Sequence, residues 1–372
     1  MAIEKVNGIE NASLPEGVQV SVTETEITPG ITELDDGSAI IGEMQEELEA
    51  SMPVPFNANL AEYIDDSELG VISSDIVGNI DEDISSRKDW EDQYKGGLEL
   101  LGMNYEDRAE PFEGASGVVH PLLAESVTQF QAQAYREMLP ASGPVRTHIV
   151  GAESPELLSQ AERVKNYMNY QITYEMEEYD PELDQMLFYL PIVGSAFKKI
   201  YFDPSMQRAV SKFVHAEDLI VPYNATDLRT STRIAHVVRM DRNEIRKLQL
   251  QGFYKDIDLP SSDSGGTNYD EVKETIDDIQ GIDKGSSYNE EITLYEVHTD
   301  LDLIGFEDIG QDGEPTGLKM PYVVTIVEKS GEILSIKRNF NEGDPFRRKI
   351  PYFVHYKFLP GLGFYGFGLT HM

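Results

Sequence analysis

The feature that most constrains this chain is a change of hydrophobic period at Gly194. Before this glycine, apolar residues recur every three or four positions, which is the period of an amphipathic helix. After it, short apolar runs alternate with turn-forming residues, which is typical of strands and hairpins. This separation of the two patterns predicts an α+β fold, with a helical half followed by short antiparallel strands and hairpins.

Four helices are expected before Gly194. They cover about residues 80–102, the stretch from Val119 to a stop at Pro140, a stretch that begins at Ser154, and one that opens at Asp180. The start at Ser154 combines a capping hydroxyl with a proline at the first helical position. The helix that follows carries one apolar stripe, made of Leu157, Ala161, Val164, Met168, Ile172 and Met176.

Seven strands are expected after Gly194. They cover residues 197–202, 209–214, 234–240, 292–303, 322–328, 333–338 and 352–358. The segment Asp203-Pro204-Ser205 joins the first two, and Lys329 to Glu332 form a hairpin turn between the fifth and the sixth. A short helix opens at Asp241, with Glu244 placed to complete a capping box.

Two segments are expected to contribute little to a core. Residues 1–60 carry twelve acidic residues and one lysine, so charge repulsion and a lack of apolar area predict a mostly disordered arm. The alternative is an arm that folds against a neighbouring subunit. Residues 256–290 are rich in Ser, Gly and Asp and are expected to form a flexible linker or surface loop. The other regions are helical (61–194), β-rich with a short helix (195–255) and β-rich again (291–372).

The chain closes on an apolar, glycine-rich run from Gly361 to Met372 that has no closing charge or cap. A phosphate-binding loop would need a preceding strand and, for nucleotide hydrolysis, a lysine and a Ser or Thr after the last glycine, and the lysine is missing. We expect instead a close-packed turn in which aromatic rings meet the backbone. Because an exposed apolar terminus would be a liability, we also expect the natural chain to continue.

Charge excludes several classes of function. The 372 residues include 67 acidic and 30 basic side chains, and the net charge is −37. This excess argues against binding of nucleic acid over the whole surface and against docking on anionic membranes. The chain has no cysteine, which excludes disulfides, thiolate zinc sites and cysteine nucleophiles. It also has no run of about 18 apolar residues that would predict a membrane span.

The sequence shows no pattern of a catalytic or metal centre. None of the seven histidines stands three or four residues from another, and none adjoins a serine elbow. Acidic pairs such as Asp35-Asp36 and Asp65-Asp66 lack the spacing of a calcium loop. We therefore expect no catalytic residue, no cofactor site and no metal site, and a protein that is not an enzyme.

Basic residues are concentrated locally. Residues 196–250 hold ten Lys and Arg against six acids, a balance of plus four, and Arg347-Arg348-Lys349 is a second cluster. Patches of opposite sign suit head-to-tail subunit contacts that close into a ring. The alternatives are internal pairing with nearby acids and direct contact with phosphate. The candidates for inter-subunit or DNA contact are Lys198, Lys199, Arg229, Arg233, Arg347, Arg348 and Lys349.

Five short motifs follow one another in a recognisable order. They are Gly117-Val118-Val119-His120-Pro121-Leu122, the segment Glu217 to Tyr223, Arg233-Ile234-Ala235-His236, the segment Tyr352 to Tyr356, and Gly363-Phe364-Tyr365-Gly366-Phe367-Gly368. In this order, over roughly residues 60–372, the chain resembles the portal proteins of tailed bacteriophages, of the large type found in short-tailed phages.

That resemblance implies a homo-oligomeric ring, usually of twelve subunits, at one vertex of the capsid. The terminase packaging motor docks on such a ring, double-stranded DNA enters and leaves through its channel, and tail or head-completion proteins attach to it. The helical region 61–194 would then be wing-like, and the protein would assemble in the host cytoplasm and reside in the virion, with no membrane partner. The alternative is an acidic, ring-forming head–tail connector or scaffold protein through which no DNA passes.

Overall fold

The computed structural model describes residues 54–98, 101, 121–204, 206–259, 291–310 and 314–372, and the backbone of two short strands near the N-terminus. The chain forms two compact units, Met1–Pro55 and Phe56–Met372. In the first unit, β1 (Ile31–Glu33) pairs antiparallel with β2 (Ala39–Ile41). The expected acidic arm lies largely outside the described residues, as do residues 260–290 of the expected linker. The second unit begins at Phe56, a few residues before the expected boundary.

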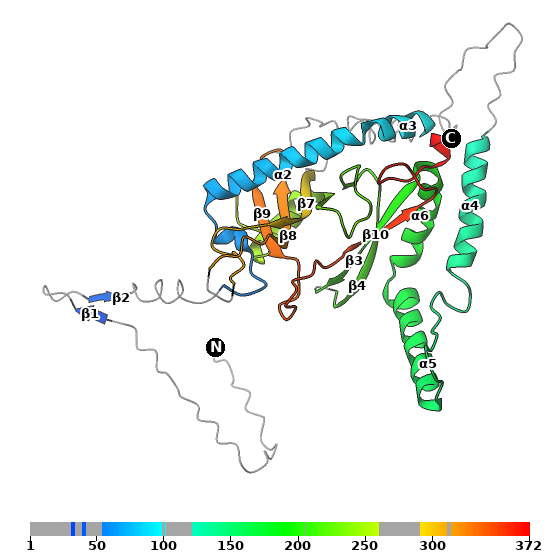
Figure 1. Cartoon of the computed structure of the whole chain (residues 1–372), viewed down its shortest axis with the longest axis horizontal. Helices are drawn as coiled ribbons and strands as arrows, with labels where there is room; N and C mark the ends of the chain where they lie inside the picture. The colour runs from blue at the N-terminus through cyan, green and yellow to red at the C-terminus, as the bar shows by residue number, and fades with distance from the viewer. Residues whose placement is uncertain are drawn as a thin grey trace, which may run out of the picture. The chain divides into compact units, whose positions relative to one another are not determined.

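The described helices lie mostly before Gly194, as predicted (Figure 1). They are η1 (Leu60–Glu62), α2 (Asp66–Ser86), α3 (Lys88–Leu98), α4 (Leu122–Met138), α5 (Pro155–Tyr170), the π-helical turn η3 (Gln171–Glu175), α6 (Tyr179–Val193), α7 (Arg242–Leu250) and η4 (Leu369–His371). The predicted capping hydroxyl is confirmed, because Leu157 N–H donates to Ser154 Oγ at 3.2 Å. At the start of α7, by contrast, the side chain of Asp241 makes no capping hydrogen bond.

The prediction of a single helix over about residues 80–102 is wrong in its bounds, although most of this stretch is helical. Two helices occupy this stretch and the one before it, because α2 begins at Asp66 and the helix breaks at Arg87 before α3 starts. The buried positions of α2 include the polar Ser73 and Asp83, and these interrupt the apolar period that would have revealed the helix. Both polar groups find partners in the fold: Ser73 donates to Gly331 O, and Asp83 pairs with an arginine of the sheet.

The described strands of the second unit form two antiparallel sheets. One has the order β10–β3–β4, from β3 (Ser195–Asp203), β4 (Arg208–Val214) and β10 (Phe353–Lys357). The other has the order β5–β6–β7–β8–β9, from β5 (Leu219–Ile220), β6 (Arg233–Asp241), β7 (Glu291–Leu301), β8 (Met320–Val327) and β9 (Ile333–Arg338). Helices and antiparallel sheets confirm the α+β class. Every predicted strand is present, and the described strands that were not predicted are the two-residue β5 and the short β1 and β2 of the first unit.

The hairpin between β8 and β9 turns where the sequence predicts it. Gly331 adopts φ +70°, and its N–H donates to Val327 O at 2.9 Å. Positive φ is the conformation that glycine adopts without a steric cost, so the turn residue and the turn geometry agree.

The glycine-aromatic segment at the end of the chain is a close-packed turn, as predicted. Phe364 and Tyr365 are fully buried, and Tyr365 stacks on Trp90 of α3 with ring centroids 4.7 Å apart. A Cβ added at Gly368 would overlap the carbonyl of Ile192, at the end of α6. Glycine is therefore required here for the backbone to approach the helix end closely.

Candidate functional site

Four of the seven candidate basic residues form ion pairs within the chain. The exposed Arg348 pairs with the loop residue Asp344 at 2.8 Å, and Arg347 pairs with Asp308. The other two connect larger elements, Lys199 with Glu296 at 2.7 Å and Arg233 with Asp83 at 2.5 Å. In the single chain, these four residues therefore pair with acidic residues of the same chain, which is one of the alternatives that the sequence left open.

The pair of Arg233 and Asp83 fixes α2 onto the five-stranded sheet. Arg233 Nε and Nη2 donate to the two carboxylate oxygens of Asp83, which is buried. The hydrogen bonds that Arg233 donates to Asp83 raise the pKa of the Arg233 guanidinium. This bidentate geometry makes Arg233 a structural residue of the folded chain.

Two candidates are turned inward. Lys198 is only 2% exposed, and its Nζ lies 4.1 Å from the centre of the Tyr179 ring. Burial lowers the pKa of Lys198 to about 8, and burial also lowers the pKa of Lys349. In the folded chain Lys198 cannot reach DNA or a neighbouring subunit without repacking. Only Arg229, in the loop before β6, is exposed and forms no ion pair among the described residues, so the seven do not form one basic patch.

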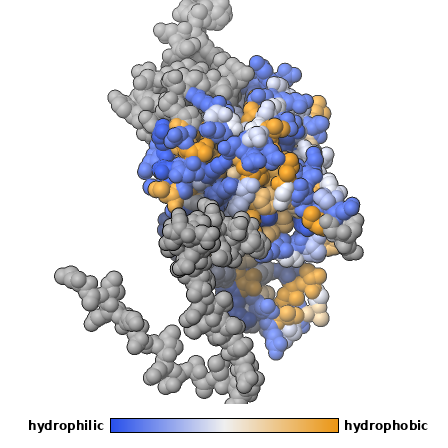
Figure 2. All heavy atoms as spheres, turned by 90° about the vertical axis from the view of Figure 1, so that its left-hand side faces the viewer, coloured by the Kyte–Doolittle hydropathy of each residue, from blue (hydrophilic) through white to orange (hydrophobic). Residues whose placement is uncertain are grey.

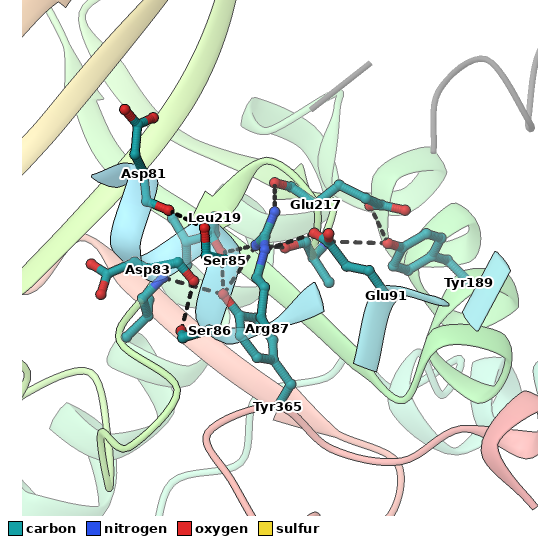
Figure 3. A network of polar contacts seen from close by, with 12 residues as sticks. Asp81, Asp83, Ser85, Ser86, Arg87, Glu91, Tyr189, Glu217, Leu219 and Tyr365 are labelled. Carbon is teal, nitrogen blue, oxygen red and sulfur yellow. Dashed lines mark hydrogen bonds and ion pairs between the residues drawn. The ribbon is translucent and has the colours of Figure 1, made fainter. Parts of the chain in front are cut away.

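A buried polar network that sequence reasoning missed surrounds Arg87, at the break between α2 and α3 (Figure 3). Arg87 is fully buried; its guanidinium donates to the carbonyls of Ala216, Glu217 and Leu219 at 2.8–3.1 Å and pairs with Glu91 at 2.7 Å. It also donates to Tyr365 Oη at 3.1 Å. A lone arginine between a serine and a lysine looks like a surface residue, so the sequence gave no signal for this role.

The network joins two of the motifs on which the portal resemblance rests. Tyr365 Oη donates to Leu219 O at 2.8 Å and accepts from Val221 N–H at 3.2 Å, and Phe364 N–H donates to Tyr223 O at 2.9 Å. The two segments lie more than 140 residues apart in the chain but pack on each other around Arg87. Their role in the single chain is therefore to hold the end of the chain against the sheet.

Burial in this network, together with the carboxylate of Glu217, shifts the pKa values of neighbouring side chains. The buried Tyr189 donates to the carboxylate of Glu217. Burial, with the charge of Glu217, raises the pKa of Tyr189 and of Tyr94 well above the usual range. Burial likewise raises the pKa of Glu91, against the opposing pull of Arg87. These groups are enclosed by the fold, where a substrate would not reach them. We therefore assign the network a structural role.

Helix α5 exposes apolar side chains that nothing in the described chain covers. No residue of α5 is buried. One side lies on the extended segment before the helix, where Asn169 bonds both backbone groups of Val145 and Thr147 donates to Ala161 O. Figure 1 shows α5 projecting away from the sheets. The lowest coloured part of Figure 2, at the height of α5, carries a group of hydrophobic side chains.

The open side of α5 and η3 forms one sector, which we call the α5 face. Helical spacing places Tyr167, Tyr170 and Tyr174 next to one another and opposite the covered side. At about 200 Å² for a whole tyrosine, exposures of 58%, 50% and 74% at Tyr167, Tyr170 and Tyr174 leave roughly 360 Å² of aromatic surface open. This already falls within the range of the largest patch on a typical monomer, about 300–600 Å². The apolar stripe residues that widen it are Leu157, Val164 and Met168.

Other classes of site find no support in the described part of the chain. No group of three or more His, Asp or Glu residues there is arranged to hold a metal ion. Among the helices that the structure describes, none combines the length and the apolar character that crossing a bilayer requires. No protein-family model and no curated protein matches this chain. The α5 face is therefore the candidate functional surface.

Proposed function

We propose that this chain is a structural portal subunit, which forms a ring at a capsid vertex through which viral DNA is packaged and ejected. The ring would also be the docking site for the packaging motor and the tail. The observation that carries the proposal is the α5 face, because a subunit of a closed ring must bury surface against its neighbours. The three tyrosines alone expose about as much surface as the largest patch on a typical monomer, which is often functional, and the apolar residues beside them make the patch larger.

Charge supports passage of DNA rather than capture of it. The net charge is −37, and the internal ion pairs of Lys199, Arg233, Arg347 and Arg348 already engage part of the positive charge. Tight binding of a duplex requires many Lys and Arg side chains that displace counterions. A wall with few free cations would let DNA slide without holding it.

The shortage of free cations also favours a second candidate, an acidic head–tail connector or scaffold ring through which no DNA passes. Both proteins would use the α5 face between subunits. They differ in the width of the ring and in whether a duplex fits through its centre.

The test combines oligomeric mass, electron microscopy and DNA affinity on the longest natural product that carries this sequence. The portal proposal expects a ring of about twelve subunits, a channel that admits B-DNA, and only weak DNA binding at about 0.15 M salt. A collar too narrow for a duplex would favour the connector. Submicromolar affinity for DNA, or a stable monomer, would contradict the portal proposal.

A matched pair of variants connects the result to the α5 face. Replacing Tyr167 and Met168 by serine should lower the oligomeric mass without changing the unfolding free energy by more than about 0.5 kcal/mol, because both side chains are exposed. The control is Tyr63→Ser, which removes a tyrosine of similar exposure outside α5. Unchanged assembly in the double variant would remove the α5 face from the proposal.

A further inference from the structure

The loop between β9 and β10 is held in one shape by its own hydrogen bonds. Ile350 N–H donates to Asn339 O at 3.1 Å and closes the loop at its base. Within the loop, the Asp344 carboxylate accepts from the backbone N–H groups of Phe346 and Arg348 at 3.1 and 3.2 Å. It also pairs with the Arg348 guanidinium at 2.8 Å. A partner would therefore meet a loop that is already ordered.

One residue of this loop adopts a strained backbone conformation. Arg347 has φ +46°, which is costly for a residue that carries a side chain. Its guanidinium pairs with Asp308 and donates to Met320 Sδ at 3.2 Å, so contacts outside the loop hold this conformation in place. Such strain persists only where the surrounding structure enforces it, and it is found most often at functional sites.

The loop presents Phe346 to solvent. This side chain is 80% exposed, more than any other aromatic side chain among the described residues. The guanidinium of the exposed Arg348 lies 5.9 Å from the centre of the Phe346 ring. Aromatic and arginine side chains are typical anchors of protein interfaces, and an ordered loop lowers the entropic cost of binding. Phe346 and Arg348 together therefore have the character of an interface anchor.

The α5 face has the chemistry that would receive this anchor. Its three tyrosines leave roughly 360 Å² of aromatic surface open, and Phe346 adds about 160 Å² if a whole aromatic side chain has about 200 Å². Aromatic rings pack favourably on one another, and tyrosine rings attract guanidinium groups. The sum of roughly 520 Å² suits the apolar centre of an interface whose standard size is about 1,600 Å².

Charge favours a second copy of this chain as the partner. Copies with a net charge of −37 repel one another, so contact costs least where bases offset the acids. Helices α5 and η3 carry three acids and two bases, a balance of minus one. Residues 341–349 of the loop carry three bases and two acids, a balance of plus one. The two surfaces are therefore weakly charged and opposite in sign.

The two surfaces lie apart on one chain. Figure 1 shows β9, from which the loop leads, at the opposite end of the second unit from α5. They can therefore meet only between copies.

We propose that Phe346 anchors a head-to-tail contact, in which it packs on Tyr167, Tyr170 and Tyr174 in the α5 face of the next copy. This inference rests on the proposed function, because it names the surface that receives the α5 face in the ring. Two different surfaces make the contact heterologous, so each copy engages two neighbours, and the chain of copies closes into a ring if the rotation between them closes. A contact of α5 with α5 would give two-fold dimers instead.

The absence of cysteine allows a cross-linking test on the longest natural product that carries this sequence. One variant carries Glu342→Cys in the loop, and the other carries Asn166→Cys on α5; both sites are exposed, and both variants keep Phe346 and the tyrosines. We expect a bismaleimide to give covalent dimers in the mixture of the two variants, and monomers when either variant is treated alone. Covalent dimers from Asn166→Cys alone would show an α5–α5 contact and would overturn the proposal.

A substitution tests the anchor itself. Phe346→Ser should raise the protein concentration of half-assembly at least about tenfold, the effect expected of an interface anchor, and leave the urea midpoint unchanged. The control is Phe202→Ser, which removes a 60% exposed phenylalanine of β3 outside both surfaces and should leave assembly unchanged.

Native mass spectrometry of the unmodified chain separates this inference from the proposed function. A ring that forms without the expected cross-link, or that Phe346→Ser does not weaken, would overturn the contact but not the ring. A chain that stays a monomer would overturn both.

Discussion

Replacement of Arg87 by methionine is expected to destabilise the chain severely. The side chain is fully buried, donates to three carbonyls and to Tyr365 Oη, and forms an ion pair with Glu91. Methionine is similar in length but supplies none of these hydrogen bonds, and it removes the cation that contacts the largely buried carboxylate of Glu91. Removing one partner of a buried ion pair costs about 3–5 kcal/mol, which is a large part of the 5–15 kcal/mol that stabilises a typical domain.

The single tryptophan of the chain provides the assay. Trp90 is buried beside the network, where it stacks on Tyr365 and donates from Nε1 to Gly366 O at 3.0 Å. Its fluorescence in a urea titration therefore reports unfolding of this region. Arg229→Met, at an exposed arginine, is the matched control and should cost no more than about 0.5 kcal/mol.

A double-mutant cycle separates the ion pair from the hydrogen bonds to carbonyls. In Arg87→Met with Glu91→Gln no buried charge is left without a partner, so the double variant should cost less than the sum of the two single variants by at least about 1 kcal/mol. Additive costs would show that the Arg87–Glu91 pair contributes nothing beyond packing. A cost below about 1 kcal/mol for Arg87→Met alone would refute the structural role of the whole network.

Three further outcomes are expected. Gly194→Ala should lower the free energy of unfolding in urea by more than about 2 kcal/mol, since Gly194 adopts φ +88° and an added Cβ would meet the backbone of Phe367 and Gly368. The control, Gly78→Ala in α2, where an added Cβ meets nothing, should instead raise it by about 0.5–1 kcal/mol. Tyr365→Phe should cost about 1–3 kcal/mol, because Val221 N–H loses its acceptor in a buried site. Below pH 6.5 the urea midpoint should fall, because burial lowers the pKa of His355 to about 3 and that of His236 to about 4. The unfolded chain then binds protons that the folded chain excludes, and each histidine lowers the free energy of unfolding by up to about 1.4 kcal/mol per pH unit. A flat midpoint between pH 7 and pH 5 would contradict these assignments.

The parts of the fold that sequence could predict are those whose period or turn chemistry is local. Two apolar runs stand on both sides of the glycine turn at Gly331, and Ser154 with Pro155 marks the start of α5 unambiguously. In each case the residues that determine the structure lie within one element.

The parts that sequence could not predict depend on contacts between distant residues. Helix α2 was missed because Asp83 occupies a buried position that only the distant Arg233 makes tolerable. The inward orientation of Lys198 depends on Tyr179 of α6, and the burial of Arg87 depends on carbonyls more than 125 residues away. Leu157, Val164 and Met168 were expected as part of an apolar stripe, but the exposed tyrosines of the α5 face were not predicted, and only the structure shows that no described element covers them.

The most direct test of the proposed function is the mass of the assembled particle, measured by native mass spectrometry on the longest natural product that carries this sequence. We expect a closed oligomer of about twelve copies, which the serine substitutions at Tyr167 and Met168 convert to smaller species with intact folds. A single copy at all concentrations and in the presence of capsid components would contradict the proposal that this chain is one subunit of a ring.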